Sequence, residues 1–326
     1  MRFKWSIFLL VVSCFSVYAT DLPVTGGWNQ DFGLGAGFTI NGPWTYTSTD
    51  VTLVSVTDTD CKGDQYRISD NNVVIGTTSA VAAGACPGNN DTANPDLAFP
   101  DATYSHGSFI LAPGAHSITI EHLVAPFGPS QLFIRADFGP GSHLTYAANL
   151  AAGDSFVNLT NAGLMGGFDP TGDICANVYV FAEDQQLIAC CSCPLTPNHL
   201  KTLSVQKDLI SNTLTPGVPV GVTVSVLATT DWVAGRQCNP AKPIDNIVGT
   251  PGVANSFAGG LRGWGGTLHA APAGGFAVTE NPLSIASMSP SEFQKVTSYC
   301  GFIIANGSGF GICGSCRQGA AGGSKK

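Results

Sequence analysis

The chain has 326 residues, of which 44% are hydrophobic and only 11% are charged, less than half of the ~25% charged share that is typical of soluble domains. This balance excludes a disordered, highly solvated chain, and the net charge of −8 argues against binding to nucleic acid or anionic lipid. The 40 glycines and 20 prolines follow no collagen-like period, so they indicate many turns between short strands.

The first residues have the pattern of a secretory signal. Arg2 and Lys4 precede an apolar stretch that is too short to span a bilayer, and small residues follow it up to Ala19. We therefore expect a leader over residues 1–19, whose removal takes the net charge from −8 to −10. Lipidation of Cys14 is an alternative, because a degenerate lipidation signal precedes it. Both routes predict a protein that is secreted, on the cell surface or, without further export, in the periplasm.

Residues 20–162 are predicted to form an antiparallel, jelly-roll-like β-sandwich. His116, Ile118 and Ile120 alternate with polar residues, as expected for a strand with one buried face. No helical pattern interrupts the β-favouring runs, and turn residues separate them. The apolar periodicity lapses at residues 163–173, where we expect the domain boundary. The predicted strands are Val51–Val56, Gln65–Ile68, Val73–Gly76, Gly107–Leu111, His116–Glu121 and Leu132–Ala136.

Several short motifs in this first half occur in an order that resembles a known extracellular β-domain. They are Val54–Asp58, Gly63–Asn71, Ile75–Ser79, Tyr104–Phe109 and His116–Ile120. The domain occurs in secreted bacterial proteins, many with a PEP-CTERM sorting tail, and in some fungal secreted proteins. The resemblance covers about residues 26–138. It implies an exported β-sandwich and brings no set of catalytic residues.

Residues 173–318 are predicted to form a second, disulfide-rich β domain, followed by a flexible tail over residues 319–326. Alternating valines from Val218 to Val226 give the clearest strand signal. Ser289, Pro290 and Glu292 form a capping box that predicts one helix over about residues 290–305. The other predicted strands are 176–181, 186–190 and 200–205. Residues 173–193, together with Cys313 to Cys316, resemble Cys-rich secreted proteins of soil bacteria.

The cysteines indicate disulfides. Ten of the 11 lie beyond the leader, and an even number in an oxidising compartment favours pairing. Cys61 and Cys86 are alone in the first half, so we expect them to bridge. The connectivity of the others stays open, and zinc bound by the Cys190–Cys193 and Cys313–Cys316 motifs is an alternative. The remaining cysteines are Cys175, Cys190, Cys191, Cys193, Cys238, Cys300, Cys313 and Cys316.

One turn concentrates acidic residues. Asp58, Asp60 and Asp64 lie close together in the sequence around Gly63, and converging carboxylates suit a hard cation. We predict a weak calcium site there, although the full EF-hand pattern is missing. The alternative is that the three carboxylates are solvated at the end of the sandwich.

Aromatic residues in turn-rich positions are candidates for stacking on sugar rings: Trp28, Trp44, Trp232 and Trp264. Trp28 and Trp44 are alternatively expected to close the ends of the core. His106 and His269 are the most suggestive general bases, but each is alternatively a structural histidine at a strand end. The sequence contains no G-x-S-x-G, no H-E-x-x-H and no phosphate-binding loop.

These features favour a non-enzymatic role, either in binding and adhesion or as a structural, possibly self-assembling component of an extracellular matrix. The predicted partner is an extracellular glycan or matrix, or a second copy of the chain, with no membrane span and no bound nucleic acid. Calcium is the one cofactor that the sequence offers. The alternative function is a secreted hydrolase acting on polysaccharide or ester substrates, because glycosidase carboxylates leave no local sequence signature.

Overall fold

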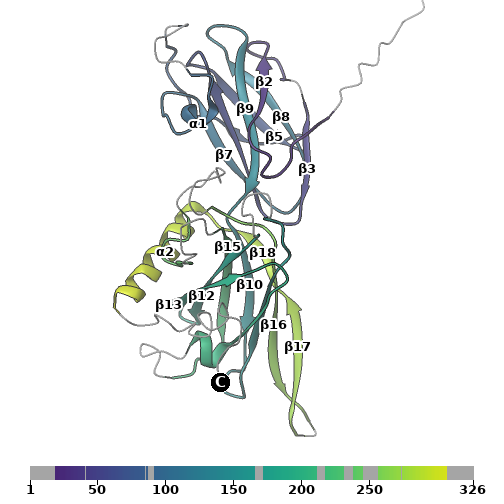
Figure 1. Cartoon of the computed structure of the whole chain (residues 1–326), viewed down its shortest axis with the longest axis vertical. Coiled ribbons are helices and arrows are strands. Elements are labelled where there is room, and N and C mark those ends of the chain that lie inside the picture. Colours follow the sequence, from purple (N-terminus) through teal and green to yellow (C-terminus); the bar gives the residue numbers. More distant parts are fainter. Residues whose placement is uncertain are drawn as a thin grey trace, which may run out of the picture.

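The computed structural model describes residues 19–40, 42–84, 86, 92–165, 172–210, 217–230, 238–244, 256–272 and 274–306. The expected leader therefore lies outside the described residues, except for Ala19. Within the described ranges the strands form four sheets, and every named strand pair is antiparallel except β1 with β3. Two of the sheets build a first unit and the other two build a second unit (Figure 1). The predicted mainly β class is confirmed.

The first unit is a sandwich of the sheets β1-β3-β8-β5-β6 and β2-β9-β4-β7. Its core holds alternate residues of both sheets, such as Val54 and Val56 from one and Ile118 and Ile120 from the other. The strands are β1 Thr20–Asp21, β2 Asn29–Gly33, β3 Trp44–Ser48, β4 Thr52–Thr59, β5 Gln65–Asp70, β6 Val73–Thr77, β7 His106–Leu111, β8 Gly114–Val124 and β9 Ser130–Phe138; a short helix, α1, spans Pro95–Ala98. All six strands predicted in this half are present, as β4 to β9.

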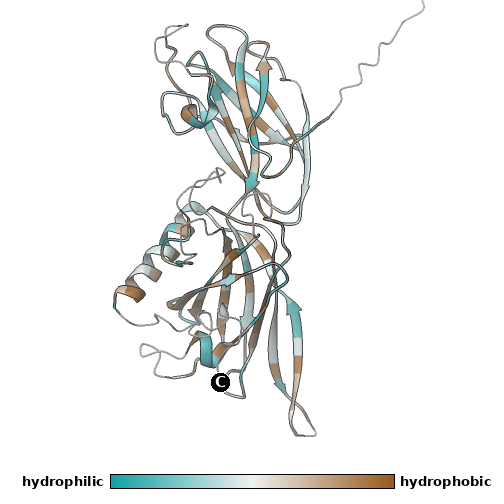
Figure 2. Cartoon of the chain, in the orientation of Figure 1, coloured by the Kyte–Doolittle hydropathy of each residue, from teal (hydrophilic) through white to brown (hydrophobic). Residues whose placement is uncertain are grey.

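The second unit pairs the sheets β13-β12-β15-β10-β18 and β14-β11-β16-β17 around a larger core. Hydrophobic residues recur along the strands that enclose this core (Figure 2). The strands are β10 Gly141–Ala147, β11 Phe156–Asn161, β12 Ile174–Ala182, β13 Leu187–Leu195, β14 Leu200–Ser204, β15 Val222–Thr229, β16 Leu261–Ala270, β17 Phe276–Pro282 and β18 Ser284–Ser287; the helices are the π-helix η1 Val205–Leu209 and α2 Pro290–Ala305.

The change from one unit to the other comes earlier than the sequence suggests. β10 and β11 hydrogen-bond within the second pair of sheets, so residues 141–161 belong with the second unit although we placed them in 20–162. The connection between β9 and β10 is Gly139-Pro140, and Gly141 begins β10. A Cβ on Gly139 would lie 2.9 Å from the carbonyl carbon of Thr52, so glycine permits the close crossing there.

The helix prediction is confirmed, and one strand is shorter than predicted. The Ser289 hydroxyl accepts a hydrogen bond from the Glu292 N–H at the start of α2. β15 begins at Val222, whereas Val218 and Val220 are exposed and precede it. Pro219 lies between these two valines and has no N–H to donate to a sheet ladder, which explains the later start.

Three disulfides join described cysteines. Cys61–Cys86 lies in the first unit, as predicted, while Cys175–Cys238 and Cys190–Cys300 lie in the second. Cys191 and Cys193 are also disulfide-bonded, and Cys313 and Cys316 lie outside the described residues. Because Cys190 bridges to α2, it is not a zinc ligand. Disulfides indicate an oxidising compartment.

Among the described helices, none is long and apolar enough to cross a membrane.

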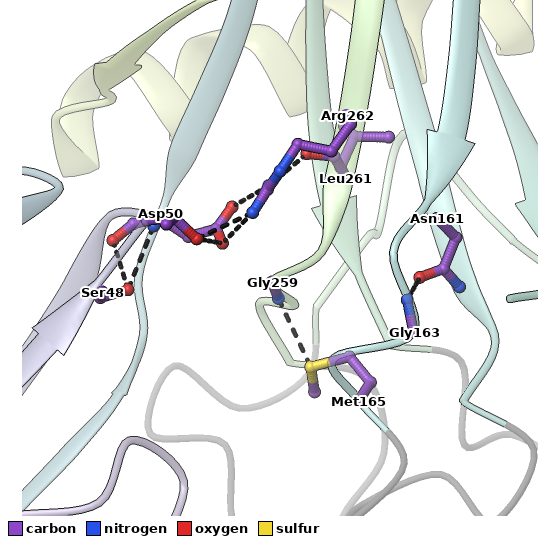
Figure 3. A network of polar contacts seen from close by, with 9 residues as sticks. Ser48, Asp50, Asn161, Gly163, Met165, Gly259, Leu261 and Arg262 are labelled. Carbon is purple, nitrogen blue, oxygen red and sulfur yellow. Dashed lines mark hydrogen bonds and ion pairs between the residues drawn. The ribbon is translucent and has the colours of Figure 1, made fainter. Parts of the chain in front are cut away.

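An ion pair joins the two units (Figure 3). Arg262 of β16 donates to both carboxylate oxygens of Asp50, at 2.9 and 3.2 Å, and also to the hydroxyl of Thr49 at 2.8 Å. Asp50 is buried in the β3–β4 turn. Burial lowers the pKa of the neighbouring His143 to about 4, so this imidazole is neutral at pH 7. The bidentate geometry fixes the orientation of the units at this contact.

Candidate functional site

A groove of about 690 Å³ opens at the side of the second unit. One wall of the groove is formed by β10 and the turn that follows it. The other wall is the two-stranded ribbon of β16 and β17. Its volume is in the range of ligand sites in proteins. The lining residues are Leu144, Thr145, Tyr146, Ala148, Asn149, Thr223, Thr267, His269, Thr279, Asn281, Pro282 and Ser284.

Strand alternation and two glycines shape this groove. Thr267 lies opposite Thr279, and Gly265 lies opposite Asn281, so these residues share one face of the ribbon. A Cβ on Gly265 would lie 2.0 Å from Thr145 Oγ1, so only glycine lets β16 approach β10 so closely. A Cβ on Gly221 would lie 2.6 Å from the Tyr146 hydroxyl, so this glycine leaves room for the Tyr146 side chain.

The lining is polar but almost free of charge. Five hydroxyl side chains and two amides line the groove, and each of them can donate and accept hydrogen bonds: Thr145, Thr223, Thr267, Thr279, Ser284, Asn149 and Asn281. Tyr146 adds an aromatic ring that is 61% exposed. The Asn149 side chain donates to the Leu268 carbonyl at 3.3 Å, which positions its amide oxygen. This set of groups suits a neutral ligand that carries many hydroxyls.

His269 is the one histidine among the described residues that line this groove. It lies near the end of β16 and is exposed. None of the described residues that line the groove is Asp or Glu. A glycosidase needs two carboxyl groups, and a histidine base is usually oriented by a carboxylate. The described lining residues therefore offer hydrogen-bonding groups, and no pair of carboxyl groups lies among them.

Trp264 lies on the opposite, outer face of the same ribbon and is 39% exposed. In the register of the sheet, Trp264 pairs with Asn158 of β11 on one side and with Pro282 of β17 on the other. The Asn158 amide donates to Glu280 at 2.9 Å and accepts from the Thr202 hydroxyl at 2.7 Å. An exposed indole beside hydrogen-bonding side chains is a second, flatter surface on which a sugar ring can stack.

The other predicted stacking residues are not equally available. Trp44 is 1% exposed within the core of the first unit, which agrees with the alternative that it closes the core. The Trp28 indole donates to Asp96 at 2.9 Å, lies 5.6 Å from the Phe99 ring, and has the Arg135 guanidinium 5.1 Å from its own ring centre. Its contacts are therefore structural. Trp232 lies outside the described residues.

His106 has a structural environment. It begins β7, and its Nδ1 is 2.9 Å from the Tyr104 carbonyl oxygen. The Phe99 ring packs against the imidazole at 5.4 Å. This agrees with the alternative that we gave for it, a hydrogen-bonded histidine at a strand end.

The acidic turn divides into a buried pair and an exposed residue. Asp58 and Asp64 are buried at the end of the first core, where the Tyr66 hydroxyl lies 3.5 and 3.3 Å from their oxygens. His122 Nε2 is 3.3 Å from Asp64. Asp60 instead has φ of +66°, is exposed, and donates its N–H to Thr92. The structure thus brings together two of the three predicted calcium ligands.

The buried pair has an unusual protonation equilibrium. Burial, and next the charge of Asp64, raise the pKa of Asp58 to about 9. Asp58 Oδ2 has no hydrogen-bond partner. A proton on Asp58 can therefore remove the repulsion between the two carboxylates in place of a cation, leaving one negative charge on the pair. No group of three His, Cys, Asp or Glu residues within the described ranges is arranged to hold a metal ion, and the calcium site stays a prediction.

Comparison with known proteins identifies no relatives by sequence: no family model and no curated protein matches the chain. Among solved structures, two of a GH2 β-galacturonidase from Eisenbergiella tayi are 10% and 9% identical, with TM-scores of 0.19 and 0.20, over 51% and 56% of this chain. A glycosyl hydrolase family 2 member from Bacteroides cellulosilyticus is 9% identical, with a TM-score of 0.17, over 81% of this chain. The chain spans 28%, 35% and 31% of their respective lengths. At such TM-scores no property of these enzymes transfers to this chain.

Proposed function

We propose that the chain is an extracellular binding protein whose ligand is a neutral glycan held in the groove between β10 and the β16–β17 ribbon. The observation that carries the proposal is the lining itself, an exposed tyrosine surrounded by threonines and asparagines without a carboxylate. Through this site the protein would adhere to a polysaccharide surface or matrix. The disulfides support the extracellular setting.

The chemistry of a sugar matches these groups. Each sugar hydroxyl both donates and accepts hydrogen bonds, as do the threonine hydroxyls and the asparagine amides of the groove. The C–H face of a pyranose is apolar, so it can cover the exposed ring of Tyr146. A charged ligand would find no Asp, Glu, Lys or Arg counter-ion among the described lining residues.

A test of this site uses Tyr146→Ala, with Tyr299→Ala as the matched control. Tyr299 on α2 is 58% exposed, close to the 61% of Tyr146, and does not line the groove. We expect Tyr146→Ala to weaken binding to a neutral polysaccharide at least about tenfold, because a lost aromatic contact of about 1.4 kcal/mol has that effect. Affinity electrophoresis and calorimetry with panels of neutral and acidic polysaccharides would measure it.

The outcomes separate the alternatives. Equal affinity of the two tyrosine variants would contradict the groove as the site. If Trp264→Ala alone abolished binding, the outer face around Asn158 and Glu280 would be the site instead. Release of reducing sugar or of ester product that depends on His269 would favour the secreted hydrolase.

A further inference from the structure

β17 is an unprotected sheet edge. All seven of its residues are exposed, and it is hydrogen-bonded on one side only, to β16. Phe276 and Val278 are 59% and 60% exposed. Figure 1 shows β17 along the outer side of the second unit, away from α2. An extended edge of this kind is a template for another strand.

The other edges of the four sheets within the described ranges are shorter or covered. β13 has nine residues, but α2 packs against it and the Cys190–Cys300 bridge ties the helix down. The next longest edge strand, β7, has six residues, and only Ser108 at its centre is exposed. β17 is therefore the longest edge strand that no helix covers.

The backbone groups that β17 offers can be assigned from its pairing with β16. The Ala271 N–H donates to the Gly275 carbonyl, which fixes the alternation of the ladder. The backbone groups of Ala277, Thr279 and Asn281 then point to β16. Those of Phe276, Val278 and Glu280 point outward. The backbone of Pro282 also points outward. Its missing N–H therefore removes no hydrogen bond to β16.

We propose that β17 pairs antiparallel with β17 of a second copy, about a two-fold axis at Thr279. In this register Val278 lies opposite Glu280 of the second copy and exchanges both backbone hydrogen bonds with it. The Phe276 N–H donates to the Pro282 carbonyl of the second copy, and the two Thr279 residues face one another. The pairing uses the full length of β17 and joins two four-stranded sheets into one.

The sequence of β17 fits a second copy of itself. The only charged residue, Glu280, faces a valine and not its own equivalent, so no like charges are opposed. Phe276 packs beside Pro282 of the second copy, so the dimer covers apolar surface that is exposed in the single chain.

The first test alters charge at Val278. Val278→Glu places two carboxylates opposite one another on each side of the two-fold axis, so we expect the dimer dissociation constant to rise at least about tenfold. Val278→Lys places a cation opposite Glu280, so this variant should dimerise as well as the unaltered chain. Val73→Glu, at a 66% exposed valine on the edge strand β6, is the matched control and should change nothing. Sedimentation velocity from about 1 μM to about 1 mM measures each constant.

The second test reads the register by cross-linking. The Thr279 residues form a non-hydrogen-bonded pair with a Cα separation of about 4.5 Å, which is within the range of a disulfide. Thr279→Cys should therefore form a covalent dimer on mild oxidation. Ala277→Cys and Asn281→Cys should cross-link only when the two variants are mixed.

Three results would overturn the proposal. The first is a monomer over the whole concentration range. The second is a dimer that Val278→Glu and Val278→Lys weaken equally. The third is a monomer whose β17 binds an added strand-forming peptide, which would assign the edge to a different protein.

Discussion

Replacing Asp58 by Asn is expected to stabilise the protein strongly at pH 8 and only weakly at pH 4. In the folded protein the pKa of Asp58 is raised from 3.8 to about 9, so the folded state keeps a proton that the unfolded chain releases above pH 4. The contribution of this group to stability is therefore fully present below about pH 4 and is lost as the pH rises through about 9. The loss by pH 8 is on the order of 5 kcal/mol, since each unit of pKa corresponds to about 1.36 kcal/mol. Asparagine does not titrate, so its variant avoids this loss.

Thermal melts between pH 4 and pH 9.5 measure the difference, and Asp60→Asn is the matched control. Asp60 lies two residues away in the same turn but is exposed, so its variant should keep the pH dependence of the unaltered protein. Parallel curves for the Asp58 variant and the unaltered protein would contradict the prediction. Millimolar calcium and chelator added at pH 8 form a further arm. A calcium-dependent rise in melting temperature that Asp58→Asn removes would support the calcium site.

Replacing both cysteines of the Cys190–Cys300 bridge by alanine is expected to cost about 4.8 kcal/mol of stability. The bridge links residues 110 positions apart, and a closed loop of that length restricts the unfolded chain strongly. It also ties α2 to β13, where Val296, Cys300 and Ile303 enter the core of the second unit. The double variant should therefore expose this core and unfold the helix at a lower temperature.

The Cys61–Cys86 pair provides the control. Its residues are 25 apart, so its removal should cost about 3.5 kcal/mol. Because this bridge belongs to the first unit, calorimetry should show the loss in a different transition. Identical thermograms for the two double variants would mean that the units do not unfold separately. An unchanged melting temperature without Cys190–Cys300 would contradict the entropic argument.

Local patterns were sufficient for much of the fold. The alternation in His116–Glu121 and the capping residues at Ser289 each depend on near neighbours, and both predictions are confirmed. β16 escaped prediction because Gly263, Gly265 and Gly266 give it a low strand propensity. At least one of these glycines is required by packing, since Gly265 faces Thr145. The transition between units was misplaced because the short link Gly139–Gly141 is less conspicuous than the glycine-rich stretch 163–173.

The candidate site was less accessible to sequence reasoning. Its residues come from separate segments around residues 145, 223, 267 and 281, and threonine and asparagine form no recognisable local motif. Among the lining residues only His269 was singled out from the sequence, as a candidate general base. For the acidic turn, proximity in sequence misled: Asp58 points into the core at the end of a strand, whereas the positive φ at Asp60 turns that residue outward. Strand alternation would place residues 58 and 60 on the same face, so the separation comes from the turn at Asp60, which alternation does not predict.

The uncharged lining of the groove has a consequence for where this protein can work. Attraction between opposite charges weakens as ionic strength rises, because the screening length falls from about 10 Å at 0.1 M salt to about 3 Å at 1 M. Hydrogen bonds and stacking onto Tyr146 involve no such long-range attraction. A ligand held by these contacts stays bound equally in dilute and in saline water. The acidic residues elsewhere on the chain can then serve solubility without repelling or recruiting the ligand.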